Sequence, residues 1–418
     1  MKIVMLSDVE TSGGAAIAAS RLATAFALSG HDVTRIVGWS QQGSFPWKTE
    51  TLRVANNFTR RIARKILPVP LFEKQLSNNL CTHLDRSLIR LKPDLINIHN
   101  LHSCFPQGWR ADLIRVCAAH APTIWTLHDM WSFTGRCAYS YDCDKFISGC
   151  DDLCPTPDEY PVLAPAKIHN AWKERQKLFQ TETTLIGVTP SQWLATQAKH
   201  GFWKHRDVRI IPNGLPLNRF RPVDRDFARK QFGIQDSRTP VLLMVGHSFS
   251  DRRKGTTLLL KALQQLKSSL TVITIGSNPP VFEIEGVKQI SPGYVENDET
   301  KVLAYNAADI FVHPSLMENQ PNVVVESIAC GTPVAAFAVG GIPEVVRPGQ
   351  TGWLTNNVSA EGLSRMIQTA LECSTSLRET CRRIAEQDYG DELQAQRYTE
   401  GINRGDTKNT ENRNYKSP

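Results

Sequence analysis

The chain has 418 residues, and this length predicts two domains of roughly 200 residues because a single hydrophobic core rarely grows so large. Hydrophobic residues make up 41% of the chain and charged residues 21%, which is a globular composition. The formal net charge is only +7, so an anionic substrate or an acidic membrane surface is favoured and a dedicated nucleic-acid partner is not.

Short apolar runs alternate with helical segments along the first half of the chain. Residues 3–6 predict a strand, a Gly-containing turn at 12–16 follows, and residues 17–28 predict a helix. A second strand is expected at 32–38, which completes a βαβ start. Three more strands, each ending in a polar or Gly-containing loop, are expected at 94–99, 123–128 and 184–188. In parallel α/β sheets, ligands bind at such strand ends.

The same alternation restarts in the second half. Residues 208–214 close the first set of strands, and a charged, Pro-containing stretch then predicts a linker. Strands of the second set are expected at 241–246, 270–275, 309–313 and 333–338. The expected parts are a first domain at 1–214, a linker at 215–239, a second domain at 240–384, a final helix at 385–402 and a disordered tail at 403–418.

The most informative segment covers residues 315–333, between a predicted strand and an apolar helix. Pro321 suits the first helical turn because proline has no N–H to lose there. Glu318 precedes the helix, whereas Glu326 falls among small and apolar residues, and a buried glutamate must be paired, hydrogen-bonded or functional. The segment resembles the Glu-x7-Glu signature of retaining, nucleotide-sugar-dependent glycosyltransferases of family 4.

The resemblance implies an α/β GT-B fold, in which two Rossmann-like, doubly wound domains face a cleft and the final helix crosses back to the first domain. It also implies a nucleotide-diphosphate sugar as donor, and a glycan or lipid-linked saccharide as acceptor. Glu318 would then bind hydroxyls of the transferred sugar, and Glu326 the two ribose hydroxyls. Main-chain N–H groups of Asn319, Asn322 and Val323 would point toward the sugar and the phosphates.

A group of cations predicts the site of the diphosphate. The run 246–255 follows a predicted strand, opens a helix, and carries Arg252, Arg253 and Lys254. A helix N-terminus with nearby Arg and Lys side chains is a good cradle for phosphate. Lys254 matches the family pattern, but His247 stands where that pattern has arginine, so Arg252 or Arg253 would supply the missing charge. Solvated cations on a surface loop are the alternative.

Two predicted strand ends of the first domain carry histidines. The resemblance places His128 against the donor sugar, with its main-chain carbonyl near the reacting carbon, and Asp129 would orient this imidazole or cap a helix. His99 and His102 leave a neighbouring strand and are expected on the acceptor side. For each histidine, a partly buried and hydrogen-bonded ring is the structural alternative.

The remaining part of the expected site is a turn with Gly13 and Gly14, which the family carries beside the donor phosphates, although any tight βα turn uses glycine. The implied reaction is hexosyl transfer with retention, in which His128, Lys254 and Glu318 are the expected catalytic groups. The cations of the phosphate loop would make a catalytic metal unnecessary.

Four cysteines gather within 18 residues, at Cys137, Cys143, Cys150 and Cys154. A similar insertion, here residues 135–155, occurs in the subgroup of the family associated with exopolysaccharide and colanic-acid-type synthesis. Four thiolates around Zn²⁺ would brace such a loop, which makes a structural zinc site a hypothesis. The spacings are not those of a zinc ribbon, so reduced thiols without metal are the alternative.

Other functions fit the sequence less well. The two glutamates are a poor acid–base pair for a glycoside hydrolase, because eight helical residues span about 12 Å, beyond the roughly 5–9.5 Å of such pairs. A sugar-nucleotide epimerase is the alternative within the fold. A non-catalytic module that uses the cysteine cluster on nucleic acid is the alternative from another class, but the aromatic–basic interleaving of an RNA-binding surface is absent.

The place of the protein in the cell is expected to be the cytoplasm. The apolar run after Met1 is too short for a secretory signal, and no stretch of about 18 apolar residues occurs. Residues 58–67 are basic and amphipathic, so they would contact the inner face of the membrane if the acceptor is lipid-linked. A solvated helix face is the alternative for this stretch.

Overall fold

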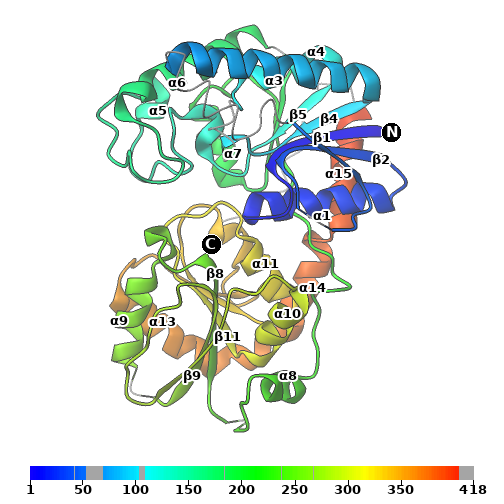
Figure 1. Ribbon diagram of the computed structural model, residues 1–418. Coiled ribbons are helices and arrows are strands. Elements are labelled where there is room, and N and C mark those ends of the chain that lie inside the picture. The colour runs from blue at the N-terminus through cyan, green and yellow to red at the C-terminus, as the bar shows by residue number, and fades with distance from the viewer. Residues whose placement is uncertain are drawn as a thin grey trace.

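The computed structural model describes residues 1–41, 43–52, 69–102, 109–182, 184–236, 238–266 and 268–403. The basic stretch 58–67 lies outside these ranges, as does the expected tail apart from Asn403. Two parallel sheets, each with helices on its faces, lie one above the other and form two domains (Figure 1). In the described ranges, none of the helices is both long and apolar enough to cross a bilayer.

The first domain is built on seven parallel strands in the order β3-β2-β1-β4-β5-β6-β7. The strands are β1 (Lys2–Val9), β2 (Asp32–Trp39), β3 (Lys48–Thr51), β4 (Leu95–Ile98), β5 (Thr123–Thr126), β6 (Ile186–Thr189) and β7 (Val208–Ile210). The helices are α1 (Gly14–Leu28), α3 (Val69–Leu91), α4 (Asp112–His120), η2 (Met130–Phe133), α5 (Lys145–Ser148), α6 (Pro165–Thr181) and α7 (Gln192–His200). Strands β4 and β5 are wholly buried, as expected for apolar strands covered on both faces.

The second domain has six parallel strands in the order β10-β9-β8-β11-β12-β13. The strands are β8 (Val241–Ser248), β9 (Leu270–Ser277), β10 (Val287–Gly293), β11 (Ile310–His313), β12 (Val334–Phe337) and β13 (Gly352–Thr355). The helices are α8 (Arg225–Gln231), η3 (Arg252–Lys254), α9 (Thr256–Gln265), α10 (Asp298–Ala307), α11 (Asn322–Ala329), α12 (Ile342–Val345), α13 (Ala360–Cys373), η4 (Ser374–Leu377) and α14 (Arg378–Asp388). Helix α15 (Asp391–Asn403) follows them in the chain.

Every strand expected from an apolar run is present, and β3, β10 and β13 are additional. All three lie at sheet edges. Strands β3 and β10 have no fully buried residue, and β13 has only Gly352. Their sequences therefore lack the apolar run by which the central strands are recognised.

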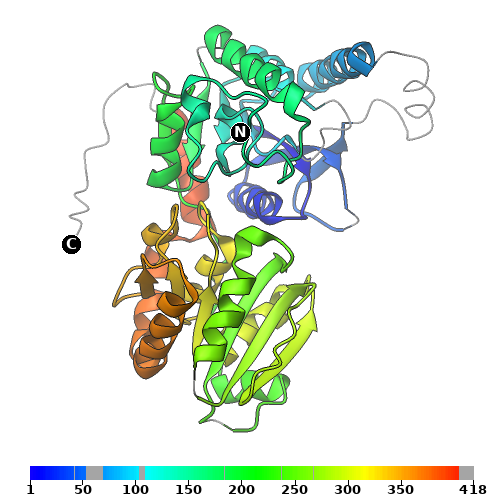
Figure 2. The ribbon, with the colours of Figure 1, turned by 90° about the vertical axis from the view of Figure 1, so that its left-hand side faces the viewer.

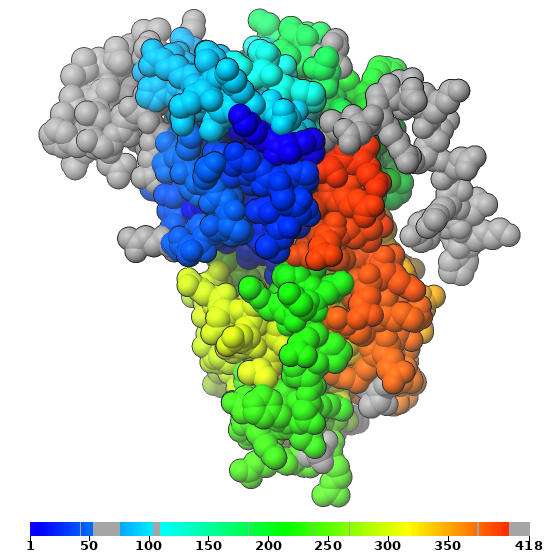
Figure 3. Space-filling view, turned by 90° about the vertical axis from the view of Figure 1, so that its right-hand side faces the viewer, coloured from blue at the N-terminus to red at the C-terminus, as the bar shows by residue number. Residues whose placement is uncertain are grey.

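The chain passes between the domains twice. After β7 it runs to Leu215, whose N–H donates at 2.8 Å to the carbonyl of Tyr389, the residue that follows α14 on the way back. Helix α15 then packs against α1, as the red helix in Figures 2 and 3 shows. Tyr398 of this helix lies in the apolar core of the first domain, and its hydroxyl bonds to the Thr126 hydroxyl at 2.9 Å. The final helix thus crosses back to the first domain.

Candidate active site at the domain interface

The segment that carries Glu318 and Glu326 lies where the two domains meet. It leaves β11, and α11 begins at Asn322 after Pro321, whose φ of −71° suits a helix start. Four of its polar side chains bond to the first domain. The contacts are Asn319 Nδ2 to the His128 carbonyl (3.0 Å), Gln320 Oε1 to the Asn213 N–H (2.6 Å), Asn322 Nδ2 to the Gly14 carbonyl (2.9 Å) and Glu326 Oε1 to Arg21 Nη2 (2.6 Å). Val323 instead packs against the core of the second domain.

Glu318 is buried between two cations. Its Oε1 lies 2.5 Å from Arg253 Nη1 and 2.6 Å from Lys254 Nζ, and His313 Nε2 is 3.9 Å away. Burial alone would raise the pKa of Glu318, but the charges of Arg253 and Lys254 hold it well below its usual range. The carboxylate is therefore ionised at neutral pH, and two positive charges are concentrated beside it.

Of the two candidate arginines, Arg253 is the one that reaches Glu318. Its Nη1 also donates to the Met317 carbonyl at 3.1 Å, and its guanidinium lies 5.1 Å from the ring centre of Tyr139 in the first domain. Arg252 is exposed. His247, at the position where arginine was expected, is also exposed and meets Tyr294 edge-on at 5.3 Å between ring centres.

Two glycines hold the backbone around Glu318. Gly255 follows Lys254 with φ +66°, and an added Cβ would lie 1.9 Å from the Pro314 carbonyl oxygen. Gly340 has φ +58°, and its Cβ would lie 1.9 Å from the carbonyl oxygen of Glu318 itself. Only glycine accepts both this backbone conformation and this approach. The loops around the acidic group are therefore fitted closely to one another.

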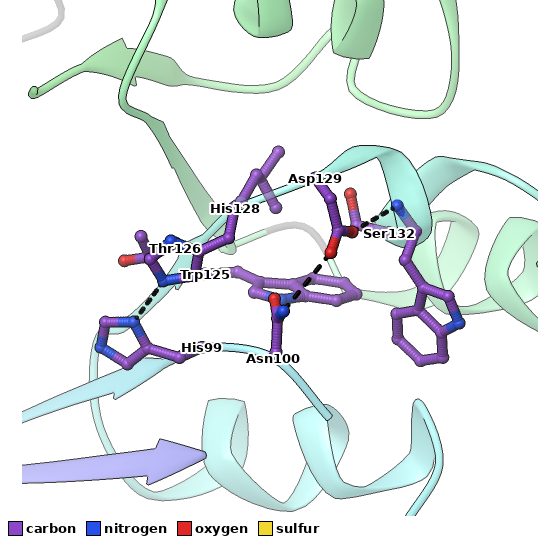
Figure 4. A pocket seen from close by; sticks show the side chains of 9 residues that line it. His99, Asn100, Trp125, Thr126, His128, Asp129 and Ser132 are labelled. Carbon is purple, nitrogen blue, oxygen red and sulfur yellow. Dashed lines mark hydrogen bonds between the residues drawn. The ribbon is translucent and has the colours of Figure 1, made fainter. Parts of the chain in front are cut away.

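The ends of β4 and β5 bring His99 and His128 together in a small pocket (Figure 4). His99 Nδ1 and His128 Nε2 are 2.9 Å apart, and the rings stack with centres separated by 5.2 Å. Burial lowers the pKa of His128 to about 4 and that of His99 well below its ordinary value. Both rings are therefore neutral at pH 7, and a protonated ring nitrogen of one donates to the unprotonated ring nitrogen of the other.

The carboxylate of Asp129 pairs with His102 and not with His128. Its Oδ2 is 2.9 Å from His102 Nε2 and accepts a bond from Asn100 at 3.3 Å, while its Oδ1 caps η2 by accepting the Trp131 N–H at 2.9 Å. Burial alone would lower the pKa of His102, but the adjacent carboxylate raises it. Of the two roles expected for Asp129, the helix cap is confirmed, and its carboxylate turns toward His102 on the neighbouring strand end instead of toward His128.

The glycine turn of the first domain meets the start of α11. Gly13 has φ +87° and precedes the first turn of α1, and its carbonyl accepts the Ile17 N–H at 2.9 Å. The Gly14 carbonyl accepts the bond from Asn322. The turn is therefore near the segment predicted to hold the donor.

Sequence reasoning missed the partners of Glu326. Its Oε1 pairs with Arg21 of α1, and its Oε2 accepts a bond from the Tyr305 hydroxyl at 3.0 Å. A signal for one partner is present in the sequence, because Arg21 interrupts a helix of small and apolar residues. Tyr305, on α10, has no comparable signal.

The zinc site predicted for Cys137, Cys143, Cys150 and Cys154 is not supported. In the described part of the chain, no group of three or more His, Cys, Asp or Glu side chains is placed to hold a metal ion. All four cysteines are free thiols, and burial raises the pKa of Cys137 to about 11 and that of Cys150 to about 12. The thiols of Cys137 and Cys150 are therefore protonated at neutral pH when no metal is bound.

Arginines organise the cysteine-containing insertion. Arg175 Nη1 donates to the carbonyls of Thr134 and Gly135 at 2.5 and 2.8 Å, and Arg136 Nη1 donates to the Pro161 carbonyl at 2.9 Å. Cys150 packs in the apolar core and accepts the Gly135 N–H at 3.2 Å. Protein hydrogen bonds thus order a loop for which zinc had been predicted as the brace.

The paired Rossmann-like domains define a GT-B architecture. The solved structure of sucrose-phosphate synthase from Thermosynechococcus elongatus matches 96% of this chain and 98% of its own with a TM-score of 0.72 and 21% identity. The complex of Anabaena HepE with UDP-glucose matches 96% of this chain and 99% of its own, with a TM-score of 0.66 and 19% identity. At these identities the similarity establishes the fold alone.

Two family models identify the chain. Residues 12–219 match Glycosyltransferase Family 4, and residues 239–373 match Glycosyl transferases group 1. The chain belongs to this family of glycosyltransferases. Among curated relatives, the putative colanic acid biosynthesis glycosyl transferase WcaC of Escherichia coli K12 is 29% identical over 310 residues, 71% of this chain and 72% of that protein. The D-inositol 3-phosphate glycosyltransferase of Geodermatophilus obscurus is 32% identical over 200 residues, 43% of this chain and 44% of that protein.

Proposed function

We propose that the protein transfers a hexose, with retention of configuration, from a nucleotide-diphosphate sugar to a glycan or lipid-linked saccharide in surface polysaccharide synthesis. The observation that carries the proposal is the cluster of the partly buried Arg253 and Lys254 around the buried Glu318, beside the domain interface. A cluster of this kind offers cations for a diphosphate and a carboxylate for sugar hydroxyls in one place. The similarity to WcaC, a putative glycosyl transferase of colanic acid biosynthesis, and to HepE, which was solved with UDP-glucose, supports the same proposal.

Each part of the donor has a candidate partner. Lys254 and Arg253 would bind the diphosphate, and Glu318 would exchange part of its pairing with these cations for hydroxyls of the transferred sugar. Glu326 would bind the ribose: a carboxylate has about four acceptor positions, and Arg21 and Tyr305 occupy two of those of Glu326.

The proposed reaction proceeds on one face of the sugar. The acceptor hydroxyl attacks from the side on which the diphosphate leaves, and an oxygen of the departing phosphate takes the proton. The protein then contributes positioning and charge stabilisation, with Lys254 and Arg253 facing the negative charge that develops on the leaving group. His128 would contact the donor sugar, and its carbonyl is fixed by Asn319. Because two cations would carry the leaving-group charge, we propose catalysis without a metal ion.

The acceptor would approach from the first domain. His99 and His102 lie at strand ends next to His128, and the Tyr160 hydroxyl is 2.9 Å from His102 Nδ1. Tyr160 is 59% exposed, so its ring is available to an incoming saccharide. A lipid-linked acceptor would place the protein in the cytoplasm at the inner face of the membrane.

Nucleotide-sugar binding tests the proposal directly. Purified protein would be screened by thermal shift with UDP-, GDP-, ADP- and dTDP-sugars, and slow hydrolysis of the stabilising donor would be followed by nucleotide release. Lys254→Ala should weaken donor binding about 10–100-fold, as expected for loss of a charge-assisted phosphate contact. Lys261→Ala removes an exposed lysine from helix α9 and should leave binding unchanged. Equal donor affinity for Lys254→Ala and the wild type would overturn the assignment of the phosphate site.

A further inference from the structure

The ion pair between Arg21 and Glu326 joins the two domains through a nearly dry contact. Arg21 Nη2 lies 2.6 Å from Glu326 Oε1, and the side chains are only 9% and 4% exposed. The Tyr305 hydroxyl donates to the other carboxylate oxygen at 3.0 Å. Both oxygens of Glu326 are thereby fixed, one by the first domain and one by the second.

The surroundings leave Arg21 little freedom. Its guanidinium lies 5.0 Å from the ring centre of Phe220, a fully buried residue that follows the first crossing between the domains. Asp298 and Asp391 also lie within electrostatic range of Arg21. A buried cation of this kind is held in one orientation, and its direction determines that of the carboxylate it pairs with.

Neighbours of Glu326 in the chain make the same kind of contact. Asn319 is held between the His128 carbonyl and the Ser191 hydroxyl, at 3.0 and 2.5 Å, and Asn322 bonds to the Gly14 carbonyl. The segment that would hold the donor is therefore also the segment that docks the first domain. Its geometry is complete only while the domains are together.

We propose that Arg21 is a positioning residue for the donor ribose. It fixes Glu326 so that the two acceptor positions left after Arg21 and Tyr305 are satisfied match the two ribose hydroxyls. Nucleotide affinity is then coupled to docking of the first domain, because the residue that aims the carboxylate belongs to that domain. This inference rests on the proposed function, since it takes Glu326 as the ribose contact.

Calorimetric titration with UDP, GDP and ADP, each compared with its 2′,3′-dideoxy form, isolates the ribose contribution. In the wild type, loss of both hydroxyls should weaken binding of the preferred diphosphate about 10–100-fold. In Arg21→Gln, the normal diphosphate should bind about 10-fold more weakly while the dideoxy form is almost unchanged, so the ratio of the two affinities falls toward one. Arg21→Lys keeps the charge and should retain an intermediate ratio.

Arg90→Gln is the matched control. Arg90 also pairs through Nη2 with a glutamate of the first domain, at 2.7 Å from Glu50, but it is 63% exposed. This variant should keep the wild-type ratio. Should Arg21→Gln fail to fold, as judged by circular dichroism, Tyr305→Phe removes the second fixed bond without loss of charge and should also reduce the ratio.

The outcomes separate this inference from the proposed function. In the first outcome, the wild type distinguishes the normal from the dideoxy nucleotide, and folded Arg21→Lys and Tyr305→Phe keep the same ratio of the two affinities. This result overturns the positioning role of Arg21 and leaves the proposed use of a nucleotide-sugar donor intact. If the wild type binds the normal and the dideoxy diphosphates with equal affinity, Glu326 does not bind the ribose hydroxyls and the inference about Arg21 is overturned. A wild type that binds none of these nucleotides overturns both proposals.

Discussion

Neighbouring histidines at the ends of β4 and β5 have proton affinities shifted in opposite directions. His99 and His128 share one hydrogen bond between ring nitrogens and are held neutral by burial, whereas His102 faces the carboxylate of Asp129. The difference follows from which strand end the carboxylate turns to. Three imidazoles in one small region thus differ in how readily they take up a proton.

Acid should destabilise the protein through His128. Below the ordinary histidine pKa of about 6.5 the unfolded chain binds a proton that the folded protein takes up only near pH 4. Stability is therefore fully present above pH 6.5 and is lost as pH falls toward 4, by up to about 3 kcal/mol. Urea unfolding of the wild type and of His128→Asn across this range measures the effect, which should be smaller in the variant. His200→Asn removes an exposed histidine and should keep the wild-type slope, and an identical slope in His128→Asn would contradict the prediction.

At the scale of an element, the turn after β12 supports the loop of Glu318. Gly341 donates its N–H to the Glu318 carbonyl at 3.0 Å, and Gly340 approaches the same oxygen too closely for any side chain. The turn therefore fixes the position of the Glu318 backbone, and with it the position of the Glu318 carboxylate between Arg253 and Lys254. A change in the turn is transmitted to the candidate donor site without touching a charged residue.

Gly340→Ala should damage both stability and nucleotide binding. The left-handed backbone alone costs about 1–2 kcal/mol with alanine, and displacement of the Glu318 carbonyl adds to this and weakens binding several-fold. Gly233→Ala is the control, because Gly233 has a similar φ of +67° with open space around its Cβ position. Thermal unfolding and donor titration of the two variants separate the effect of the left-handed backbone, which both share, from that of the steric clash with the Glu318 carbonyl, which only Gly340→Ala has. Equal losses in both variants would show that the contact with Glu318 is unimportant.

The sequence predicts local elements better than long-range pairs. Strands that are buried on both faces can be recognised from their apolar runs. The edge strands β3, β10 and β13 lack such runs, because one side of each has no neighbouring strand. Lys254 and Glu318 are found from local motifs. The partner of Glu326 lies 305 residues away on another domain, and no spacing rule connects it. Cysteine spacing likewise does not tell whether four thiols converge, which is why the zinc prediction failed.

At the scale of the whole molecule, the last described helix belongs to the core of the first domain. Ala395 and Tyr398 pack with Ile3, Phe26 and Val33, and Tyr398 meets Phe26 edge-on with ring centres 6.1 Å apart. The first domain is therefore incomplete without a segment that follows the second domain in the chain. The stability of the first domain therefore depends on the second domain in two ways: through the contacts between them, and because the chain reaches α15 only after passing through the second domain.

Substitution of Tyr398 should destabilise the first domain selectively. Tyr398→Ala should cost about 3–5 kcal/mol from the lost buried ring, and Tyr398→Phe about 1 kcal/mol from the lost bond to Thr126. Hydrogen exchange should show the loss in β1 and β5 before it reaches β8. Tyr294→Ala, at a tyrosine that is 45% exposed in the second domain, should have little effect. Equal loss of protection in both domains would contradict the selective role of α15.

The position of α15 has a consequence for synthesis on the ribosome. Tyr398 is made 272 residues after Thr126, its hydrogen-bonding partner. At about 5–20 residues per second, roughly 15–50 seconds separate the two. During this interval the newly made first domain exposes the apolar surface that α15 later covers, so nascent chains depend on a chaperone or on slow folding of that domain. A stalled or prematurely released chain that lacks α15 would therefore keep this apolar surface of its first domain exposed, where a chaperone can bind it.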